Sequence, residues 1–398
     1  MIFRMLIIAI IGIMTPVAAA PVIDEAASKQ IDEVVNEAIS LKKAPSCCVV
    51  IGTGQKILFA KAYGRFTYDS DSPEVTLDSP YDLASCSKAT GTAIALALLL
   101  QEDKIKLDDP VRKYIPAWDV DDKREITVRN LATHTSGLIA YTSVDRAEKA
   151  KKAGESNADA LINSIATLSL KYETNKGYTY SCLNFLTLAR VNEEAAGMSQ
   201  EALLREKVWE PLGMKNTAYY MPADRKKLCV PTLVNRQGDV HDPLAYYYRG
   251  TWRCAGNAGL FSSANDLSKL CRMLLNDGRY GSSSLPGQPI IFKPEIVDLF
   301  FANQAPPVDK YTWGLGWGIS DSKRYPAPPK RGPKEASISH GGYTGTSVEI
   351  DRYAGTYTII LTNRVYPNDN TSIASIKTGV RQVVVNTDPA YQKAEEKE

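Results

Sequence analysis

The sequence has few of the residues and motifs on which metal and nucleotide enzymes depend. It contains only 3 histidines and 7 cysteines among 398 residues. It has neither a His-Glu-x-x-His segment nor a Cys-x-x-Cys pair, so no metal site is predicted. A Gly-x-x-x-x-Gly-Lys-Ser/Thr loop and a Gly-x-Ser-x-Gly elbow are also missing, and Gly314–Gly318 lacks the dinucleotide spacing. We therefore expect no metal, nucleotide or other cofactor.

Charge of one sign is also scarce. Lys+Arg total 47 against Asp+Glu 45, a net charge of +2, which argues against a nucleic-acid partner. The cysteines are too few for a disulfide scaffold, although Cys229 and Cys254 are one conceivable bridge. With 44% hydrophobic residues, the chain can instead form a globular body with a substantial core.

Long apolar runs are absent except near the start. Arg4, the uncharged stretch Met5–Met14 and the small residues Ala18–Ala20 predict a secretory signal over residues 1–20. An uncleaved anchor is the alternative, but the stretch is short for a span of about 20 residues. We expect an exported, periplasmic or secreted protein that has no membrane span once the signal is removed, with a catalytic body over 21–390 and a charged tail over 391–398.

Hydrophobic patterning along the body predicts an α+β fold. We expect an antiparallel sheet built from both chain ends and flanked by helices (about 21–82 and 250–390), with a helical insertion (about 83–249). The expected strands are Cys47–Gly52 and Ile57–Gly64, joined as a hairpin, then Thr346–Asp351 and Thr356–Thr362. The expected helical segments are Ala89–Leu100, Asp145–Ala166, Asn184–Ala196, Gln200–Leu212, Asp266–Leu275 and Ile373–Val385, with a surface loop over Ser320–Ser337.

Three Ser-x-x-Lys tetrads occur, and their contexts differ. Ser40–Lys43 lies in a polar stretch and Ser320–Lys323 in the expected surface loop, whereas Ser85–Lys88 opens the apolar helix. Residues three apart on a helix share a face, so Lys88 can reach the Ser85 hydroxyl. Burial beside the positive helix end disfavours the ammonium form, so we expect a neutral amine able to accept a proton. The alternative is a surface lysine beside a serine N-cap.

Several motifs in order resemble the serine β-lactamase-related superfamily, which contains class C β-lactamases, D-alanyl-D-alanine peptidases and family VIII-type esterases. The resemblance spans roughly residues 45–385 and implies the β-lactamase/transpeptidase-like fold and a serine nucleophile, Ser85, with Lys88. The motifs are Leu83–Thr90, Lys106–Val111, Leu131–Leu138, Pro211–Met214, Gly256–Ala264, Gly314–Trp317, His340–Ser347 and Leu361–Arg364.

The superfamily's second element is Tyr-x-Asn, in which the phenol acts as a general base or acid. Tyr180 occupies that place here, but Cys182 replaces the asparagine that contacts the substrate's amide side chain. We expect Asn184 to compensate as a substrate-binding residue. A core tyrosine is the alternative reading of Tyr180, and the literal match Tyr366–Asn368 lies too close to the third element to qualify.

The third element is Lys/His-x-Gly on a strand that lines the site. We choose His340, with Gly341 and Gly342 as substrate-binding neighbours, over the literal match Lys377–Gly379, which lies in a helical pattern. By resemblance, the Tyr343 amide completes an oxyanion hole with the Ser85 amide. A histidine is mostly neutral above pH 6.5, so a substrate carboxylate is held less firmly than by lysine.

These residues predict a serine hydrolase that acts through an acyl-enzyme on ester or amide/peptide substrates, either small molecules or peptidoglycan-like. Ser85, Lys88 and Tyr180 would be catalytic. A class C-like β-lactamase and a poorly deacylating penicillin-binding sensor are the alternatives. A Ser–His–Asp triad of Ser85 and His340 is a rival mechanism, but it would leave Lys88 without a role.

Overall fold

The main sheet joins segments from the two ends of the chain, in a computed structural model that describes residues 22–281, 289–308, 311–320 and 332–391. The strand order is β2-β1-β8-β7-β6-β5, and every neighbouring pair is antiparallel. The predicted hairpin is confirmed, because β1 pairs with β2 from Ser46 opposite Gly64. The strands are β1 Ser46–Thr53, β2 Ile57–Gly64, β5 Gly318–Ser320, β6 Ser337–Gly341, β7 Ser347–Asp351 and β8 Thr356–Thr362.

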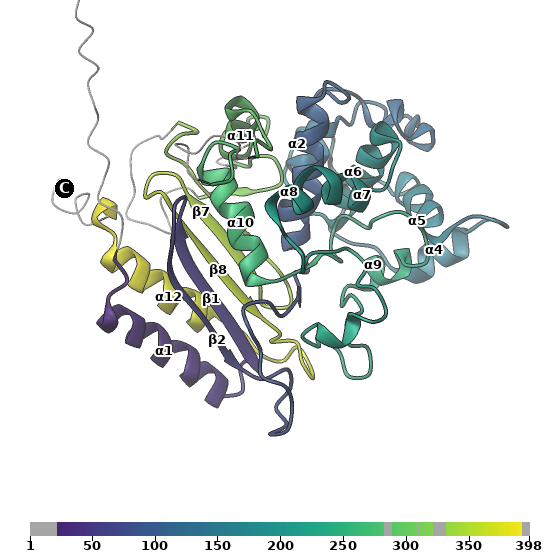
Figure 1. The fold of residues 1–398 in the computed structure, drawn as a ribbon. Coiled ribbons are helices and arrows are strands. Elements are labelled where there is room, and N and C mark those ends of the chain that lie inside the picture. The colour runs from purple at the N-terminus through teal and green to yellow at the C-terminus, as the bar shows by residue number, and fades with distance from the viewer. Residues whose placement is uncertain (1–21, 282–288, 309–310, 321–331, 392–398) are drawn as a thin grey trace, which may run out of the picture.

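Helices cover both faces of this sheet (Figure 1). On one face, α1 (Glu25–Ser40) and α12 (Ala374–Thr387) pack together over a small core that includes Ile31, Val49 and Val380. On the other face, α10 (Ala264–Leu275) packs against β1, β7 and β8. Each of these helices has an apolar stripe, which is what a helix needs to cover one side of a sheet.

The middle of the chain forms a helical layer beside α10 (Figure 1). The apolar segment predicted as a helix begins with a π-helical turn, η1 (Lys88–Thr92), and continues as α2 (Ala93–Gln101), which is almost entirely buried. Around it lie α3 Val128–Ala132, α4 Val144–Ala150, α5 Asn157–Ala166, α6 Cys182–Ala196, α7 Gln200–Leu204, η4 Arg205–Trp209, α8 Glu210–Leu212 and α9 Pro243–Tyr248, with α11 Pro294–Phe301 nearer the sheet. Short 3-10 turns are η2 Val111–Lys113, η3 Pro116–Trp118 and η5 Lys226–Leu228.

Two sequence predictions need correction in detail. The helical segment expected over Asp145–Ala166 is broken into α4 and α5, because Lys151 is extended and Ser156 starts a new helix as its N-cap. All seven cysteines are free thiols, so the conceivable Cys229–Cys254 bridge is wrong. The expected signal (1–20), most of the loop after Ser320 and most of the tail lie outside the described residues.

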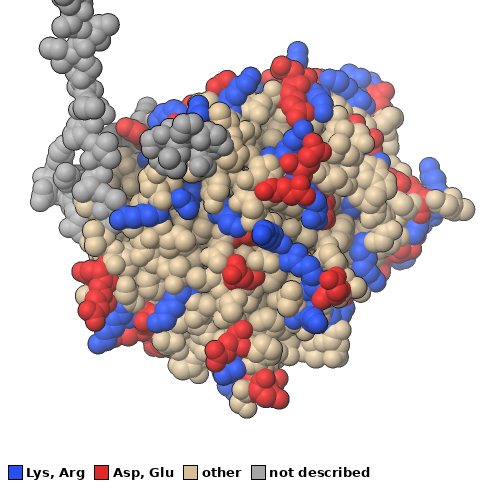
Figure 2. Space-filling model, viewed as in Figure 1, with Lys and Arg blue, Asp and Glu red and all other residues tan. Residues whose placement is uncertain are grey.

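Charged side chains of both signs are interspersed over the face seen in Figure 2. This distribution agrees with the near balance of basic and acidic residues in the whole sequence. None of the described helices has both the length and the apolar character that crossing a membrane requires.

Candidate active site

A second, two-stranded sheet positions Ser85. Strand β3 (Tyr81–Asp82) pairs with β4 (Phe261–Ser262), and the chain then turns sharply at Ala84, whose φ is 46°. A left-handed non-glycine residue is strained, so its surroundings must hold it. The Asp82 carboxylate does so in part by accepting the Ala84 amide at 2.9 Å. Ser85 follows at the opening of the helical run and remains partly exposed, while Lys88 is fully buried.

The side chains of Ser85 and Lys88 point toward each other. Lys88 Nζ lies 3.0 Å from Ser85 Oγ, 2.8 Å from the Asn257 carbonyl oxygen and 3.5 Å from Cys182 Sγ. The Tyr180 ring centroid lies 5.1 Å from Lys88 Nζ, and its phenol interacts with both Ser85 and Lys88. The structure thus brings together the three residues predicted to be catalytic.

The expectation that Lys88 is a neutral amine is wrong, because its pKa is raised rather than lowered. Burial does disfavour its ammonium form, but Cys182, Tyr180 and the Asp242 carboxylate outweigh burial, so the pKa of Lys88 is raised above its ordinary value. The three acceptors around Nζ also match the three N–H donors of an ammonium. Burial raises the pKa of the Tyr180 phenol despite the opposing influence of Lys88. The resting pair is therefore an ammonium beside a neutral phenol.

The turn between β6 and β7 forms another wall of the candidate site. It is joined to the nucleophile turn by Thr344 Oγ1, which donates to the Asp82 carbonyl at 2.7 Å, and by Thr346 Oγ1, which donates to the Leu83 carbonyl at 2.8 Å. Within the described residues, the Ser85 and Tyr343 amides donate no hydrogen bond to another group. Both remain available to bind an oxyanion.

His340 lies in β6, whereas Lys377 lies in helix α12, as the patterns predict. Burial and the nearby Lys88 lower the pKa of His340 to about 3, so its imidazole is neutral at physiological pH. Its Nδ1 lies 3.0 Å from the Gly341 carbonyl oxygen, which indicates that Nδ1 carries the proton. The buried Nε2 has no partner among the described residues and is left as an acceptor.

Gly342 packs against the turn before Ser85, while Gly341, the last residue of β6, is exposed. A Cβ on Gly342 would lie 2.3 Å from the Leu83 carbonyl oxygen, so this glycine permits close contact with the nucleophile turn.

Asn184 does not reach the substrate side, which corrects the expectation that it binds substrate. It is fully buried, with its side chain accepting from Ser136 Oγ at 2.6 Å and contacting His134 Nδ1 at 3.2 Å. The Ser181 amide donates to the same His134 nitrogen. Asn184 and His134 thus form a layer behind Tyr180, whose ring lies 4.6 Å from the His134 ring.

The sequence analysis missed an aromatic wall and a polar loop. Tyr178, Tyr311 and Trp313 stack in series, and Trp313 meets His340 edge-on. Asp242 begins α9 as its N-cap, and its side chain contacts Asn257. The Asp-Pro pair at the start of α9 is a recognisable helix-start signal, but only the tertiary structure places it beside Lys88.

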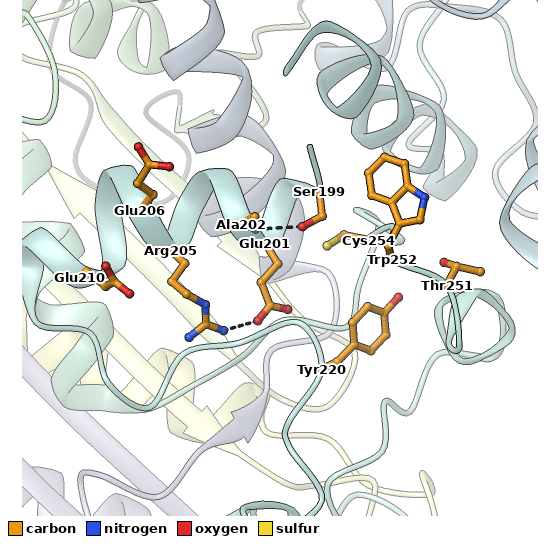
Figure 3. A pocket seen from close by; sticks show the side chains of 10 residues that line it. All are labelled: Ser199, Glu201, Ala202, Arg205, Glu206, Glu210, Tyr220, Thr251, Trp252 and Cys254. Atoms are coloured by element: carbon orange, nitrogen blue, oxygen red, sulfur yellow. Dashed lines mark hydrogen bonds and ion pairs between the residues drawn. The ribbon is translucent and has the colours of Figure 1, made fainter. Parts of the chain in front are cut away.

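A separate hollow of 420 Å³ lies between α7–α8 and the loop at Trp252 (Figure 3). Arg205 pairs there with Glu201, and Lys207 pairs with Glu206. It contains none of the predicted site residues, so we assign it no chemistry. Its lining residues are Ser199, Glu201, Ala202, Arg205, Glu206, Glu210, Tyr220, Thr251, Trp252 and Cys254.

Comparison with known sequences gives a match to the Beta-lactamase family model over residues 31–377. The chain is 26% identical over 381 residues to the N-acetylmuramyl-L-alanine amidase of Bacillus subtilis (strain 168), covering 87% of this chain and 84% of the relative. It is 25% identical over 351 residues to an Escherichia coli (strain K12) protein provisionally named D-alanyl-D-alanine carboxypeptidase, covering 80% and 78%.

Solved structures share the fold. The hydrolase EstCE1, described as having promiscuous acyltransferase activity, superposes with a TM-score of 0.70 at 20% identity, covering 90% of this chain and 98% of its own. A class C β-lactamase from Rhodobacter sphaeroides gives a TM-score of 0.67 at 17% identity, covering 90% and 99%.

Proposed function

The chain belongs to the Beta-lactamase family, and we propose that within this family it is an exported serine hydrolase that acts through an acyl-enzyme on ester or amide substrates. The observation that carries the proposal is the 3.0 Å contact between Ser85 Oγ and Lys88 Nζ, with the Tyr180 ring centroid 5.1 Å from the same nitrogen. A serine hydroxyl held against a lysine and a tyrosine, which can accept its proton after releasing one to solvent, is an arrangement that supports nucleophilic catalysis.

In the proposed mechanism, the Lys88–Tyr180 pair first releases one proton to solvent, because the resting pair is fully protonated. Ser85 Oγ then attacks the substrate carbonyl carbon, and the pair accepts the hydroxyl proton. The oxyanion accepts hydrogen bonds from the Ser85 and Tyr343 amides. The tetrahedral intermediate collapses as the pair returns the proton to the leaving group, which leaves an acyl ester on Ser85.

Water completes the proposed cycle. The pair removes a proton from the attacking water, and the acyl group leaves as a carboxylic acid while Ser85 regains its proton. Every step uses side chains and amides of the chain itself.

We place esters and peptides ahead of β-lactams as substrates. The Cys182 thiol, which replaces the asparagine of the second motif, lies 3.5 Å from Lys88 Nζ and cannot offer the paired donor and acceptor of an asparagine amide. His340 is neutral, so it supplies no fixed charge for a substrate carboxylate. Two relatives named for peptidoglycan amide cleavage support a peptide-like substrate.

The test compares three substrates: a p-nitrophenyl ester, a D-alanyl-D-alanine peptide and a chromogenic cephalosporin. We expect turnover of the ester or the peptide, and a loss of at least about a thousandfold in kcat/KM for Ser85→Ala. Ser40→Ala is the matched control, because Ser40 begins another Ser-x-x-Lys tetrad but ends α1 on the far side of the sheet. Unchanged turnover in Ser85→Ala would refute the proposal.

A poorly deacylating penicillin-binding sensor is the second candidate, and the replacement of asparagine by Cys182 favours it. Intact-mass measurement after addition of a penicillin distinguishes the two. A stable adduct on Ser85 without turnover of any substrate would indicate a sensor, whereas a transient adduct or none, with ester or peptide turnover, would indicate the hydrolase.

A further inference from the structure

The loop that leads into α9 is linked to the turn before Ser85 and also, through Asn257, to Lys88. The Asp82 carboxylate accepts the Ala84 amide at 2.9 Å and the His241 amide at 2.7 Å. It therefore ties the strained turn before Ser85 to this loop. The His241 ring also lies 5.7 Å from the Tyr343 ring, on the side of the proposed oxyanion site.

The next residue, Asp242, reaches Lys88 through Asn257. Asp242 Oδ1 accepts from the Asn257 side-chain amide at 3.1 Å, and the Asn257 carbonyl oxygen accepts from Lys88 Nζ at 2.8 Å. The same Oδ1 caps α9 by accepting the Ala245 amide at 2.8 Å. Asp242 Oδ2 accepts from the Tyr141 hydroxyl at 3.0 Å. Asn257 is fully buried and Asp242 is partly exposed, so the Lys88 end of this chain of contacts is the part shielded from water.

Asp242 differs in charge from the other groups that favour the ammonium of Lys88. Those groups are the Cys182 thiol and the Tyr180 phenol, which are ordinarily neutral near pH 7, whereas a carboxylate is an anion. Other titratable groups that interact with Lys88 include the Cys86 thiol and the neutral imidazoles of His134 and His340. The carboxylate thus supplies the negative charge that Lys88 faces in the resting site.

We propose that Asp242 is a positioning residue for acyl transfer: through Asn257 it fixes the catalytic lysine, and its charge sets the pH at which Ser85 becomes reactive. This inference rests on the proposed function, because it assigns Lys88 a role in activating Ser85. Removing the carboxylate disfavours the ammonium, so the Lys88–Tyr180 pair releases its proton at a lower pH.

The experiment measures the rate at which a fluorophosphonate labels Ser85 of the full chain between pH 5 and pH 10, by intact mass. In the wild type, we expect the rate to rise with pH throughout this range, because the pKa values of Lys88 and Tyr180 are both raised above their ordinary values. In Asp242→Asn, we expect the same rate to be reached at a pH lower by about half to one unit. Asparagine can still cap α9, because its side-chain oxygen can accept the Ala245 amide.

Asp239→Asn is the matched control. It removes a carboxylate from the same loop, where the partner is Lys226 rather than the site, so its pH dependence should equal that of the wild type. Circular dichroism checks that each variant is folded. Should Asp242→Asn fail to fold, Asp242→Ser, which retains a capping oxygen, takes its place with the same expectation.

The two proposals fail in different ways. Labelling of wild-type Ser85 with an unchanged pH dependence in the Asp242 variant would overturn this inference alone. Lack of labelling of wild-type Ser85 at every pH would overturn the proposed function, and this inference with it.

Discussion

The three histidines respond differently to burial and to the cation at Lys88. His134 and His340 are buried, and burial together with Lys88 lowers the pKa of both, to about 3 for His340. His241 is less enclosed, and burial lowers its pKa from the ordinary 6.5 to a smaller extent. Burial, reinforced by nearby lysine charge, thus keeps the imidazoles of His134 and His340 neutral.

We predict that His340 stays neutral between pH 8 and pH 5, which NMR of its ring protons can follow. An unfolded chain protonates this imidazole near pH 6.5, whereas the folded chain does so near pH 3. The folded state therefore loses stability as pH falls below 6.5, by about 2 kcal/mol at pH 5. Between pH 7 and pH 5, the free energy of unfolding should therefore fall by about 2 kcal/mol less in His340→Gln than in the wild type.

The wild type must be compared with His340→Gln because two buried carboxyl groups change the stability of the fold with pH in the opposite sense. Burial raises the pKa of Asp82 to about 6 and that of Glu193 to about 7, so both favour the folded state at low pH and lose that contribution as pH rises. Their contribution cancels between wild type and His340→Gln. A His340 resonance that titrates near pH 6.5 would contradict the prediction.

At the scale of elements, the β6–β7 turn and the turn before Ser85 form one packed unit. Thr344 and Thr346 donate to Asp82 and Leu83 carbonyls, and Cys86 Sγ lies 3.3 Å from the His340 carbonyl oxygen. The proposed oxyanion hole draws one amide from each turn, so its geometry depends on how closely they approach.

Adjacent glycines in this unit should differ in their tolerance of a methyl group. A Cβ on Gly342 would lie 2.1 Å from Thr346 Oγ1 and 2.3 Å from the Leu83 carbonyl, whereas the nearest atom to a Cβ on Gly341 is Lys377 Nζ at 3.5 Å. We expect Gly342→Ala to lower the free energy of unfolding by about 1–3 kcal/mol, measured in urea, and to slow labelling of Ser85.

Gly341→Ala serves as the control for the added methyl group. Because its surroundings leave room at ordinary contact distance, we expect its stability to lie within about 0.5 kcal/mol of the wild type. Equal stability of the two variants would show that the turns do not depend on close packing at Gly342.

At the scale of the whole molecule, the layered packing determines which thiols solvent can reach. Six of the seven cysteines are buried, and Cys182 alone is partly exposed. Burial also raises the pKa of thiols such as Cys48, to about 12, which further lowers their reactivity.

We predict that a thiol reagent modifies one cysteine in the folded protein and seven in urea without reductant. The single reactive thiol should be Cys182, because the other six have no solvent access. In folded Cys182→Ser, the reagent should therefore modify no cysteine. Fewer than seven thiols in urea would indicate a disulfide and contradict the structure.

Sequence alone determined the features that are local along the chain. The spacing of Ser85 and Lys88 on an apolar helix predicts that their side chains meet, because helix geometry fixes neighbours three residues apart. Alternation and turn residues likewise predicted the β1–β2 hairpin and the strands β7 and β8. The same local patterns distinguished His340 on a strand from Lys377 in a helix.

Tertiary structure decided what surrounds those residues. Cys182, Asn257 and Asp242 come from positions 94 to 169 residues away from Lys88, and together with Tyr180 they reverse the protonation expected from burial alone. Packing also turned Asn184 away from the substrate side and toward His134. Charge, solvent access and hydrogen-bond partners depend on distances through space, and these distances exist only once the sheet and the helical layer have packed together.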